Sequence, residues 1–459
     1  MYGRFIIALL MTLLFPTLHP AVGATGQETG TPEGPDEAVR RRRALEIGKD
    51  LREELRVDRY QVYLDWEEGL RIETGQKHIR LKVGGRINLD AGNIGTDDDL
   101  PQPFPDPGGF ETNLRRAAFT ALWTFYDTVD LKLEMDFSNV KDVKDNWVGI
   151  RRVPIIGYVQ FGHQKEPFSL EELAGGNSFT FMERALPTEA FAPRRNLGFM
   201  TQSEAFDKQM TWAVGGFWDV GKTSSLDDLI SPKDRIAGAT GFNITGRVTG
   251  LPWQADGGRR YLHLGFSYSH QFRDEKDRSA RVRYATPPES LLEENLRLVD
   301  TDALFADAVD LINPEFALVS GPLSLQGEYF HAFVDSNPSG DPQFWGFYLY
   351  TSCFLTGEYR GYNTSRGTFS RLRPDQNFRL RDGQWGALEA GLRVSHIDLT
   401  DGHIKGGRES NLTFGLNWYL NREVRLMFNY IRAYVRGRRD PAVDDWQGNI
   451  FQARFQFAF

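Results

Sequence analysis

The chain has 459 residues, of which 40% are hydrophobic and 25% are charged. A protein that crosses a bilayer with many helices needs apolar runs of about 20 residues each, and this composition excludes such a protein. An aromatic content of 13% excludes a wholly disordered chain. The 54 Lys and Arg residues are outnumbered by 62 Asp and Glu residues, so the net charge of −8 gives no reason to expect a nucleic-acid partner.

The first 24 residues have the pattern of a secretory signal peptide. Arg4 supplies a positive charge, Phe5 to Phe15 form an apolar run, and small residues end the segment at Ala24. The run is too short to cross a bilayer, so we expect a cleaved signal and not an anchor. Residues 25–59 are predicted to form a disordered leader and a short charged periplasmic helix over Asp36–Val57, with a contact between subunits as the alternative role of this helix.

From Tyr60 onward the hydrophobic pattern has a period of two. Residues 412–420 place Leu, Phe or Trp at even positions and polar or small residues, with one Tyr, at odd positions. Similar alternation is found at residues 79–89, 116–125, 129–137 and 262–269. Each segment therefore predicts a β-strand with one apolar and one polar face. Cys353 is the only cysteine, so no internal disulfide holds these strands together.

Two all-β folds fit this alternation, a soluble sandwich and an outer-membrane barrel. The segments run for about 9–11 residues, the length that a tilted strand needs to cross a bilayer. Aromatic residues such as Trp123 and Trp418 lie near strand ends, as in the girdles of membrane barrels. The chain ends at Phe459 on an alternating strand, which resembles the signal that the outer-membrane assembly machinery recognises. We therefore expect a transmembrane antiparallel β-barrel over residues 60–459.

The spacing of the segments predicts the number of strands. At roughly 25 residues per strand and connection, residues 61–459 hold about 16 strands, and an even number is expected. A barrel of this size encloses an aqueous channel. The short connection Asn421–Glu423 is predicted to be a periplasmic turn, and residues 168–208, 273–313 and 356–384 are predicted to be long loops or inserts.

Four segments resemble the phosphate-selective porin O and P family, and they occur in family order. They are GHQKEPF at 162–168, TFMERALP at 180–187, FLTGE at 354–358 and LTFGLNWYL at 412–420. The resemblance implies a homotrimeric, 16-stranded porin in the lipid bilayer of the Gram-negative outer membrane. It further implies that arginines and lysines draw phosphate through a constriction formed by infolded loops, although many relatives carry the fold without proven phosphate specificity.

Passage of small anions such as phosphate needs cations that face the lumen. A guanidinium forms paired hydrogen bonds with phosphate, and several weak sites in a row let an ion enter and leave. The candidate anion-binding residues are Lys82, Arg86, Arg116, Lys132, Arg184, Arg194, Arg195, Arg247 and Arg393. The alternative is that each cation merely pairs with an acid, as Glu134 beside Lys132 suggests, and that the protein is a general porin or one for another substrate.

Other chemistry has weaker support in the sequence. Gly216–Thr223 fits the pattern of a nucleotide-binding loop, but its bulky residues and the alternation before it predict a barrel strand. The histidines lack metal-ligand spacing, so no metal or cofactor is expected, and Glu171 and Glu172 are predicted to lie on a loop surface. A barrel enzyme, such as an esterase, and a structural or adhesion protein remain the alternatives from other classes.

Overall fold

The structure is a computed structural model. It describes residues 62–66, 68–75, 77–96, 109–138, 142–219, 241–273, 281–293, 296–336, 339–440 and 443–459. The chain divides into two units, Met1–Arg56 and Val57–Phe459, and the described residues all belong to the second. The predicted signal peptide, leader and charged helix lie outside the described residues.

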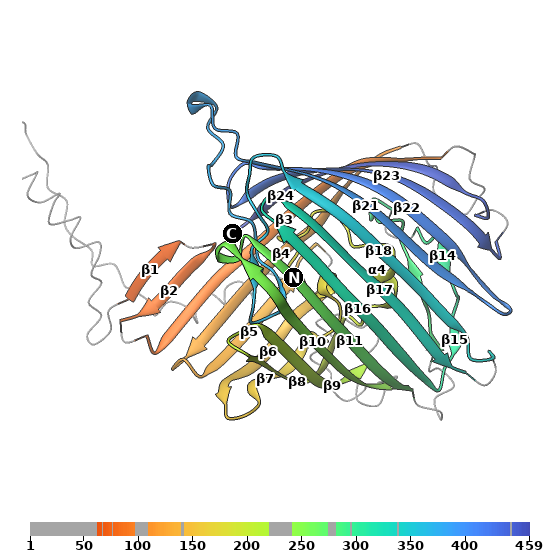
Figure 1. Cartoon of the computed structure of the whole chain (residues 1–459), viewed down its shortest axis with the longest axis horizontal. Coiled ribbons are helices and arrows are strands. Elements are labelled where there is room, and N and C mark those ends of the chain that lie inside the picture. The colour runs from red at the N-terminus through yellow and green to blue at the C-terminus, as the bar shows by residue number, and fades with distance from the viewer. Residues whose placement is uncertain are drawn as a thin grey trace, which may run out of the picture. The chain divides into compact units, whose positions relative to one another are not determined.

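Sixteen antiparallel strands close into a barrel (Figure 1). The strands are β3 (Ile79–Thr96), β4 (Phe110–Phe125), β5 (Val129–Asp136), β6 (Asp142–Val153), β7 (Gly157–Lys165), β8 (Arg195–Ala205), β9 (Met210–Asp219), β10 (Gly241–Ala255), β11 (Arg260–Arg273), β16 (Ala308–Ser320), β17 (Leu323–Asp335), β18 (Gln343–Phe354), β21 (Ala387–Asp401), β22 (Ile404–Tyr419), β23 (Val424–Arg438) and β24 (Gln447–Ala458). The barrel closes where β24 pairs with β3, from Gly448 opposite Thr96 to Ala458 opposite Arg86. The predicted fold and strand number are thus confirmed.

A hairpin extends the sheet beyond the closed wall. Strands β1 (Val62–Trp66) and β2 (Leu70–Thr74) pair with each other, and β2 pairs with the first residues of β3. Figure 1 shows this hairpin at the left end of the barrel. Strand β3 has 18 residues, and only part of it pairs with β24. The first residues of β3 are therefore free to pair with β2.

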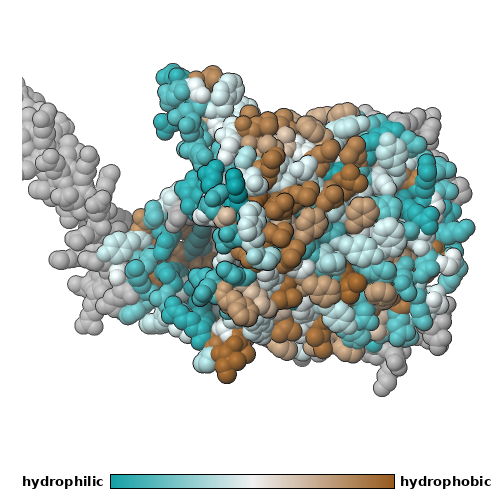
Figure 2. Space-filling model, viewed as in Figure 1, coloured by the Kyte–Doolittle hydropathy of each residue, from teal (hydrophilic) through white to brown (hydrophobic). Residues whose placement is uncertain are grey.

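The wall is apolar on the outside, and on the inside it carries polar residues as well as the apolar ones that pack against the inserts. Leu392 and Val394 of β21 are 46% and 45% exposed, whereas Arg393 between them is completely buried. On the face that Figure 2 shows, apolar side chains form a broad band across the middle of the barrel, with hydrophilic residues toward both ends. A soluble sandwich would bury its apolar face, so this arrangement requires a lipid environment around the band.

The two ends of the barrel differ in the length of their connections. At one end the strands are joined by turns such as Tyr126–Thr128 and residues 420–423, which confirms the predicted turn at Asn421–Glu423. Phe459 lies toward this short-turn end, because it pairs with Gly85 of β3. Strand β1 lies there as well, because its partner β2 pairs with the first residues of β3. In membrane barrels the short turns are periplasmic and the long loops extracellular.

Three long connections depart from a plain barrel. We call residues 166–194, between β7 and β8, the first insert; residues 274–307, between β11 and β16, the second insert; and residues 355–386, between β18 and β21, the third insert. The expected loop over residues 168–208 was too long, since Arg195 already begins β8. Met200 faces the central cavity while Thr201 lies on the opposite face of the strand, so the hydrophobic pattern of β8 is blurred.

The inserts contain only short regular elements. The first insert holds α3 (Leu170–Leu173) and α4 (Leu186–Phe191). The second insert holds β12 (Arg281–Val282), β13 (Ala285–Thr286), β14 (Val299–Asp300) and β15 (Leu304–Phe305). The third insert holds β19 (Tyr362–Asn363), β20 (Thr368–Phe369) and the 3₁₀ turn η3 (Leu380–Asp382). A further 3₁₀ turn, η2 (Asp256–Gly258), joins β10 and β11. In the part of the chain that the structure describes, no helix has the length and apolar character to cross a membrane.

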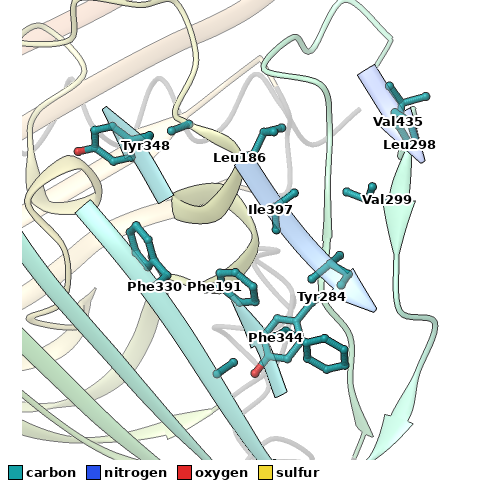
Figure 3. Close-up of a cluster of buried hydrophobic side chains, with 14 of the residues drawn as sticks. Leu186, Phe191, Tyr284, Leu298, Val299, Phe330, Phe344, Tyr348, Ile397 and Val435 are labelled. Carbon is teal, nitrogen blue, oxygen red and sulfur yellow. The ribbon is translucent and has the colours of Figure 1, made fainter. Parts of the chain in front are cut away.

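A hydrophobic core inside the barrel fixes the first insert to one half of the wall. Leu186 and Phe191 of α4 belong to a cluster of buried side chains that also includes residues of the second insert and of β17, β18, β21 and β23 (Figure 3). The ring centroid of Phe191 lies 5.1 Å from that of Tyr284. Nearby, the backbone N–H groups of Leu170 and Glu171 donate to the carboxylate of Glu328 at 3.2 and 2.7 Å. The inserts therefore cover this half of the wall, and open space remains toward the other half.

Candidate functional site

A central cavity of about 1890 Å³ runs between the first insert and the uncovered half of the wall. Its lining extends from Phe459 at the short-turn end to Asp219, the last residue of β9, at the opposite end. Strands β3 to β10 supply most of the wall, and the first and third inserts supply the facing side. A cavity that reaches from one end of the barrel toward the other provides the path that a channel needs.

The cavity lining is rich in cations. Among the described residues, 18 Lys and Arg line the cavity against 10 Asp and Glu. The cations are Lys82, Arg86, Arg115, Arg116, Lys132, Lys144, Arg151, Arg152, Lys165, Arg184, Arg194, Arg195, Arg247, Arg297, Arg366, Arg371, Arg373 and Arg454. The lining thus has an excess of positive charge, although the whole chain has a net charge of −8.

A β-bulge in β4 adds an arginine that the sequence pattern did not predict. Arg116 pairs with Asn88 and Leu114 pairs with Leu89, so Arg115 is an extra residue without a partner in the register. At a bulge the side-chain alternation breaks, and both arginines line the cavity. Strict alternation placed Arg116 in the lumen and Arg115 outside. The only signal in the sequence is the pair of adjacent arginines itself.

Two irregularities in β6 have the same effect. The register shifts between Leu133 and Met135 of the neighbouring strand, and both Lys144 and Asp145 line the cavity there. It shifts again before Val153, where Arg151 and Arg152 are both lining residues. These breaks add charged side chains to the lumen that a pattern of period two cannot indicate.

Three of the candidate cations lie on β3 and β4 with weak or no carboxylate partners. Lys82 is exposed and forms no ion pair with the described residues. Arg86 donates to Asn177 Oδ1 of the first insert at 3.3 Å, and its Nε atom is buried without a hydrogen-bond partner. The Nε atom of Arg116 lies 3.5 Å from Asp136 Oδ2. These groups keep donor capacity for an ion in the cavity.

Two other candidates on the wall share carboxylates. Lys132 Nζ lies 2.8 Å from Glu134 Oε2 and 2.7 Å from Asp145 Oδ2. Arg195 also pairs with Asp145. Their charges are therefore largely neutralised by near neighbours, as the general-porin alternative assumed.

The candidates in the first insert also pair with acids. Arg184 Nε lies 3.0 Å from Glu172 Oε2, and Arg194 pairs with Glu189. Burial raises the pKa of Glu172, but Arg184 and Lys165 outweigh burial, so this pKa lies below its usual value. Glu172 is buried, as is its neighbour Glu171, so the expectation that they lie on a loop surface was wrong.

Glu183 links the first insert to the wall, and sequence reasoning missed it. Its carboxylate accepts two hydrogen bonds of 3.0 Å from Arg115 and one of 2.6 Å from Arg454 of β24. Burial raises the pKa of Glu183, but the two arginines more than offset burial and leave the pKa well below its usual value. Nothing in the local pattern distinguishes Glu183 from other acids, because its partners come from distant strands.

Arg247 lines the cavity but already has a full set of partners. Its Nη2 atom lies 2.5 Å from Glu315 Oε1, and it donates to the backbone carbonyls of Arg366 and Gly367 at 3.1 and 2.8 Å. It therefore fastens the third insert to the inside of the barrel. The prediction that this residue faces the lumen fits its position, but its donors are used by the protein.

Arg393 lies behind the inserts and is absent from the cavity lining. It is fully buried, its Nη2 atom lies 2.6 Å from Glu289 Oε2, and its guanidinium lies 4.4 Å from the ring centre of Phe181. The alternation correctly predicts that it points inward. The structure corrects its expected contact with ions, because the inserts cover this half of the wall.

The third insert enters the barrel from the short-turn end and meets the first insert. Arg360 pairs with Glu389 of β21 at 2.5 Å and donates to the carbonyl of Ser178 at 3.1 Å. Tyr362 lies with its hydroxyl 2.7 Å from His263 Nδ1. The two inserts together form the side of the cavity that faces β3 to β10.

Other sequence patterns occupy structural positions. Residues 216–219 of the apparent nucleotide-binding loop belong to β9, which pairs with β8 and β10. The rest of that pattern lies outside the described residues. Within the described ranges, no group of three or more His, Cys, Asp and Glu residues has an arrangement suited to a metal ion.

A closed barrel of this size, with an apolar exterior and a charged central cavity, is an outer-membrane porin. Residues 81–459 match the family model of the phosphate-selective porin O and P proteins, and the chain belongs to this family. The protein is therefore a channel of the Gram-negative outer membrane, with the short-turn end in the periplasm.

Two relatives cover most of the chain. An uncharacterised protein of Caulobacter vibrioides is 29% identical over 404 residues, which are 86% of this chain and 77% of that protein. Porin O of Pseudomonas aeruginosa is 23% identical over 433 residues, which are 88% of this chain and 93% of Porin O.

A solved porin has the same fold. The anion-selective porin from Comamonas acidovorans matches with a TM-score of 0.50 and 12% sequence identity, over 83% of this chain and all of that one. At this identity the match supports the barrel fold and leaves selectivity to the residues of the channel itself.

Proposed function

We propose that this porin lets small anions, including phosphate, diffuse passively across the outer membrane. The observation that carries the proposal is the composition of the cavity lining, in which the described residues include 18 Lys and Arg but only 10 Asp and Glu. A local excess of positive charge raises the concentration of anions in a narrow channel, whatever the net charge of the whole protein. The name of the family and the anion selectivity of the Comamonas acidovorans porin support the same direction.

Within this lining, we propose Lys82, Arg86 and Arg116 as the groups that contact the ion. They lie on neighbouring strands, and the Nε atom of Arg86 has no partner among the described residues. The side chain of Arg86 reaches the first insert at Asn177, so it stands where the insert and the wall approach each other. Arginine is suited to phosphate because its fork of donors matches two oxygen atoms.

In this proposal the other candidate cations act through the electrostatic potential of the channel. Lys132, Arg184, Arg194 and Arg195 each have an acidic partner, and they contribute to the potential more than to direct contact. The same ion pairs favour the second candidate function, a general porin in which charges of both signs solvate the wall. The two functions differ in whether phosphate binds inside the channel.

The experiment that tests the proposal is a bilayer recording with the purified porin. A zero-current potential in a KCl gradient gives the sign of the selectivity, and we expect anion preference. Phosphate added to chloride solutions should reduce the chloride current more than nitrate does, because paired hydrogen bonding recognises geometry as well as charge. Cation preference would contradict the proposal, and anion preference without a phosphate effect would leave the general porin.

We also propose how the porin assembles and what recognises it during insertion into the membrane. Membership of the family supports a homotrimer in the bilayer, to be tested by native mass spectrometry in mild detergent. Phe459 stacks on Trp66 with ring centroids 5.9 Å apart and pairs with Gly85, so the last residue is built into the wall. We propose that this strand is recognised by the outer-membrane assembly machinery.

A further inference from the structure

Two arginines lie side by side on the outer surface of the barrel, away from the channel. Arg408 of β22 and Arg436 of β23 are partners in the strand register. The side chain of Arg408 is 56% exposed and that of Arg436 is 77% exposed. Residues directly opposite in an antiparallel pair have their Cβ atoms about 5 Å apart, and like charges there are destabilising. The pair therefore calls for a negative partner.

Each arginine has one acidic partner, and each partner is contacted through the Nε atom. Arg408 Nε donates to Asp398 Oδ2 at 2.8 Å, and Asp398 also accepts from the backbone and hydroxyl of Thr400. Arg436 Nε lies 3.5 Å from Asp445, whose side chain is itself 79% exposed. The terminal Nη groups of both arginines have no partner among the described residues. These Nη groups therefore keep donor capacity for a ligand on two side chains that are largely exposed.

Further cations adjoin the pair toward the extracellular end. Lys405 and Arg439 are both exposed, and the backbone N–H of Arg439 donates to the carbonyl of Lys405 at 3.1 Å. On the other side, Arg432 donates to Gln447 Oε1 at 2.9 Å and lies over the ring of Tyr434. We call Lys405, Arg408, Arg436 and Arg439 the rim patch.

Below the rim patch the outer surface becomes apolar, beyond Ser410 and beside Arg432, which is the register partner of Leu412. Along β22 the side chains on the same face as Arg408 continue as Ser410, Leu412 and Phe414, and the last two are 45% and 48% exposed. Phe428 of β23 is 47% exposed on the same wall. This arrangement places a cluster of cations above a wall that contacts acyl chains, at the level where the extracellular leaflet has its headgroups.

We propose that the rim patch binds a phosphorylated glycolipid of the extracellular leaflet. Its phosphate would accept hydrogen bonds from the free Nη groups of Arg408 and Arg436, and its acyl chains would lie along Leu412, Phe414 and Phe428. The geometry of a guanidinium suits a phosphate group. A freely diffusing phosphate ion would use the cations but gain nothing from the apolar wall, so the lipid is the ligand that fits both parts.

The test compares three forms of the full-length porin purified in detergent. They are the wild type, the double variant Arg408→Ala/Arg436→Ala, and a control, Arg379→Ala/Arg381→Ala, that removes two exposed arginines from the periplasmic third insert. Lipopolysaccharide and the same lipid stripped of its phosphates are titrated, and bound lipid is counted by native mass spectrometry. The single variant Arg436→Ala and the heat-dependent gel mobility of every form guard against loss through misfolding.

We expect the rim double variant to bind the phosphorylated lipid about tenfold more weakly, since charge-assisted hydrogen bonds to phosphate contribute on that order, while the control binds like the wild type. Removal of the phosphates should abolish the difference, and inorganic phosphate at millimolar concentration should not displace the lipid. Equal binding by all three forms, or full displacement by inorganic phosphate, would overturn the proposal. The proposal would also be overturned if the oligomers of the rim double variant dissociated while lipid binding stayed intact, because this face would then be a contact between protomers. The proposal is independent of ion selectivity, and the rim variant should conduct like the wild type.

Discussion

Replacing Arg86 by glutamine is the most direct test of how the channel attracts anions. Arg86 lies on the cavity wall beside Asn177 and has no carboxylate partner among the described residues. A monovalent anion about 4 Å from a guanidinium gains about 1 kcal/mol in bulk water and about 4 kcal/mol at the effective dielectric constant near a protein surface. Even the lower value corresponds to about a fivefold change in local anion occupancy.

We therefore expect the Arg86→Gln channel to lose about fivefold in its anion-to-cation permeability ratio, without reversal, because the other lining cations remain. The assay is the zero-current potential in a planar bilayer under a KCl gradient, and the shift should grow at low salt, where screening is weaker. Arg379→Gln, on the exposed tip of the third insert outside the cavity lining, is the matched control. A potential unchanged by Arg86→Gln, or changed equally by the control, would refute the reasoning.

Three further predictions concern the inserts and the barrel seam. Arg393 pairs with buried Glu289 and Glu171 and donates to the carbonyl of Glu183 in the first insert. Arg393→Ala should therefore cost about 3–5 kcal/mol, measured as a lower unfolding temperature and a larger, noisier conductance. A quiet, stable channel would show that the first insert does not need this anchor. The pKa of Glu183 is depressed in the folded state, so ionised Glu183 stabilises the fold at pH values above the unfolded pKa of about 4.3, and this stabilisation is lost as the pH falls through the folded pKa. Acid titration should therefore lower the stability of the wild type more than that of Glu183→Gln. Parallel curves of stability against pH for the two proteins would contradict this. Deletion of Phe459 removes its pairing with Gly85 and should reduce membrane assembly while export continues, as measured by fractionation; normal assembly would show that this residue is dispensable.

The fold was largely predictable because membrane barrels repeat one simple rule. Lipid on one side and water on the other impose a period of two along every strand, and residues 412–420 show it without interruption. The predicted turn at Asn421–Glu423 follows from the same pattern. The rule fails where the backbone departs from the regular strand, as at the bulge that brings Arg115 into the lumen beside Arg116.

The channel was less predictable than the barrel, since it depends on contacts between distant segments. Alternation places Arg393 on the inner face, but only the folded inserts decide that it is buried. Likewise, Glu183 joins β4 and β24 through partners 68 and 271 residues away in the chain. Charge alone does not tell a lining cation from an anchoring one.

The contact between the first and third inserts has a mechanical consequence. The first insert enters from the extracellular side and the third from the periplasmic side, and Arg360 connects them through the carbonyl of Ser178 while it also pairs with Glu389 of the wall. The two mouths of the pore are therefore joined by a continuous brace through the interior. A displacement of the third insert at the periplasmic mouth would therefore reach the first insert, which lines the cavity, through this contact.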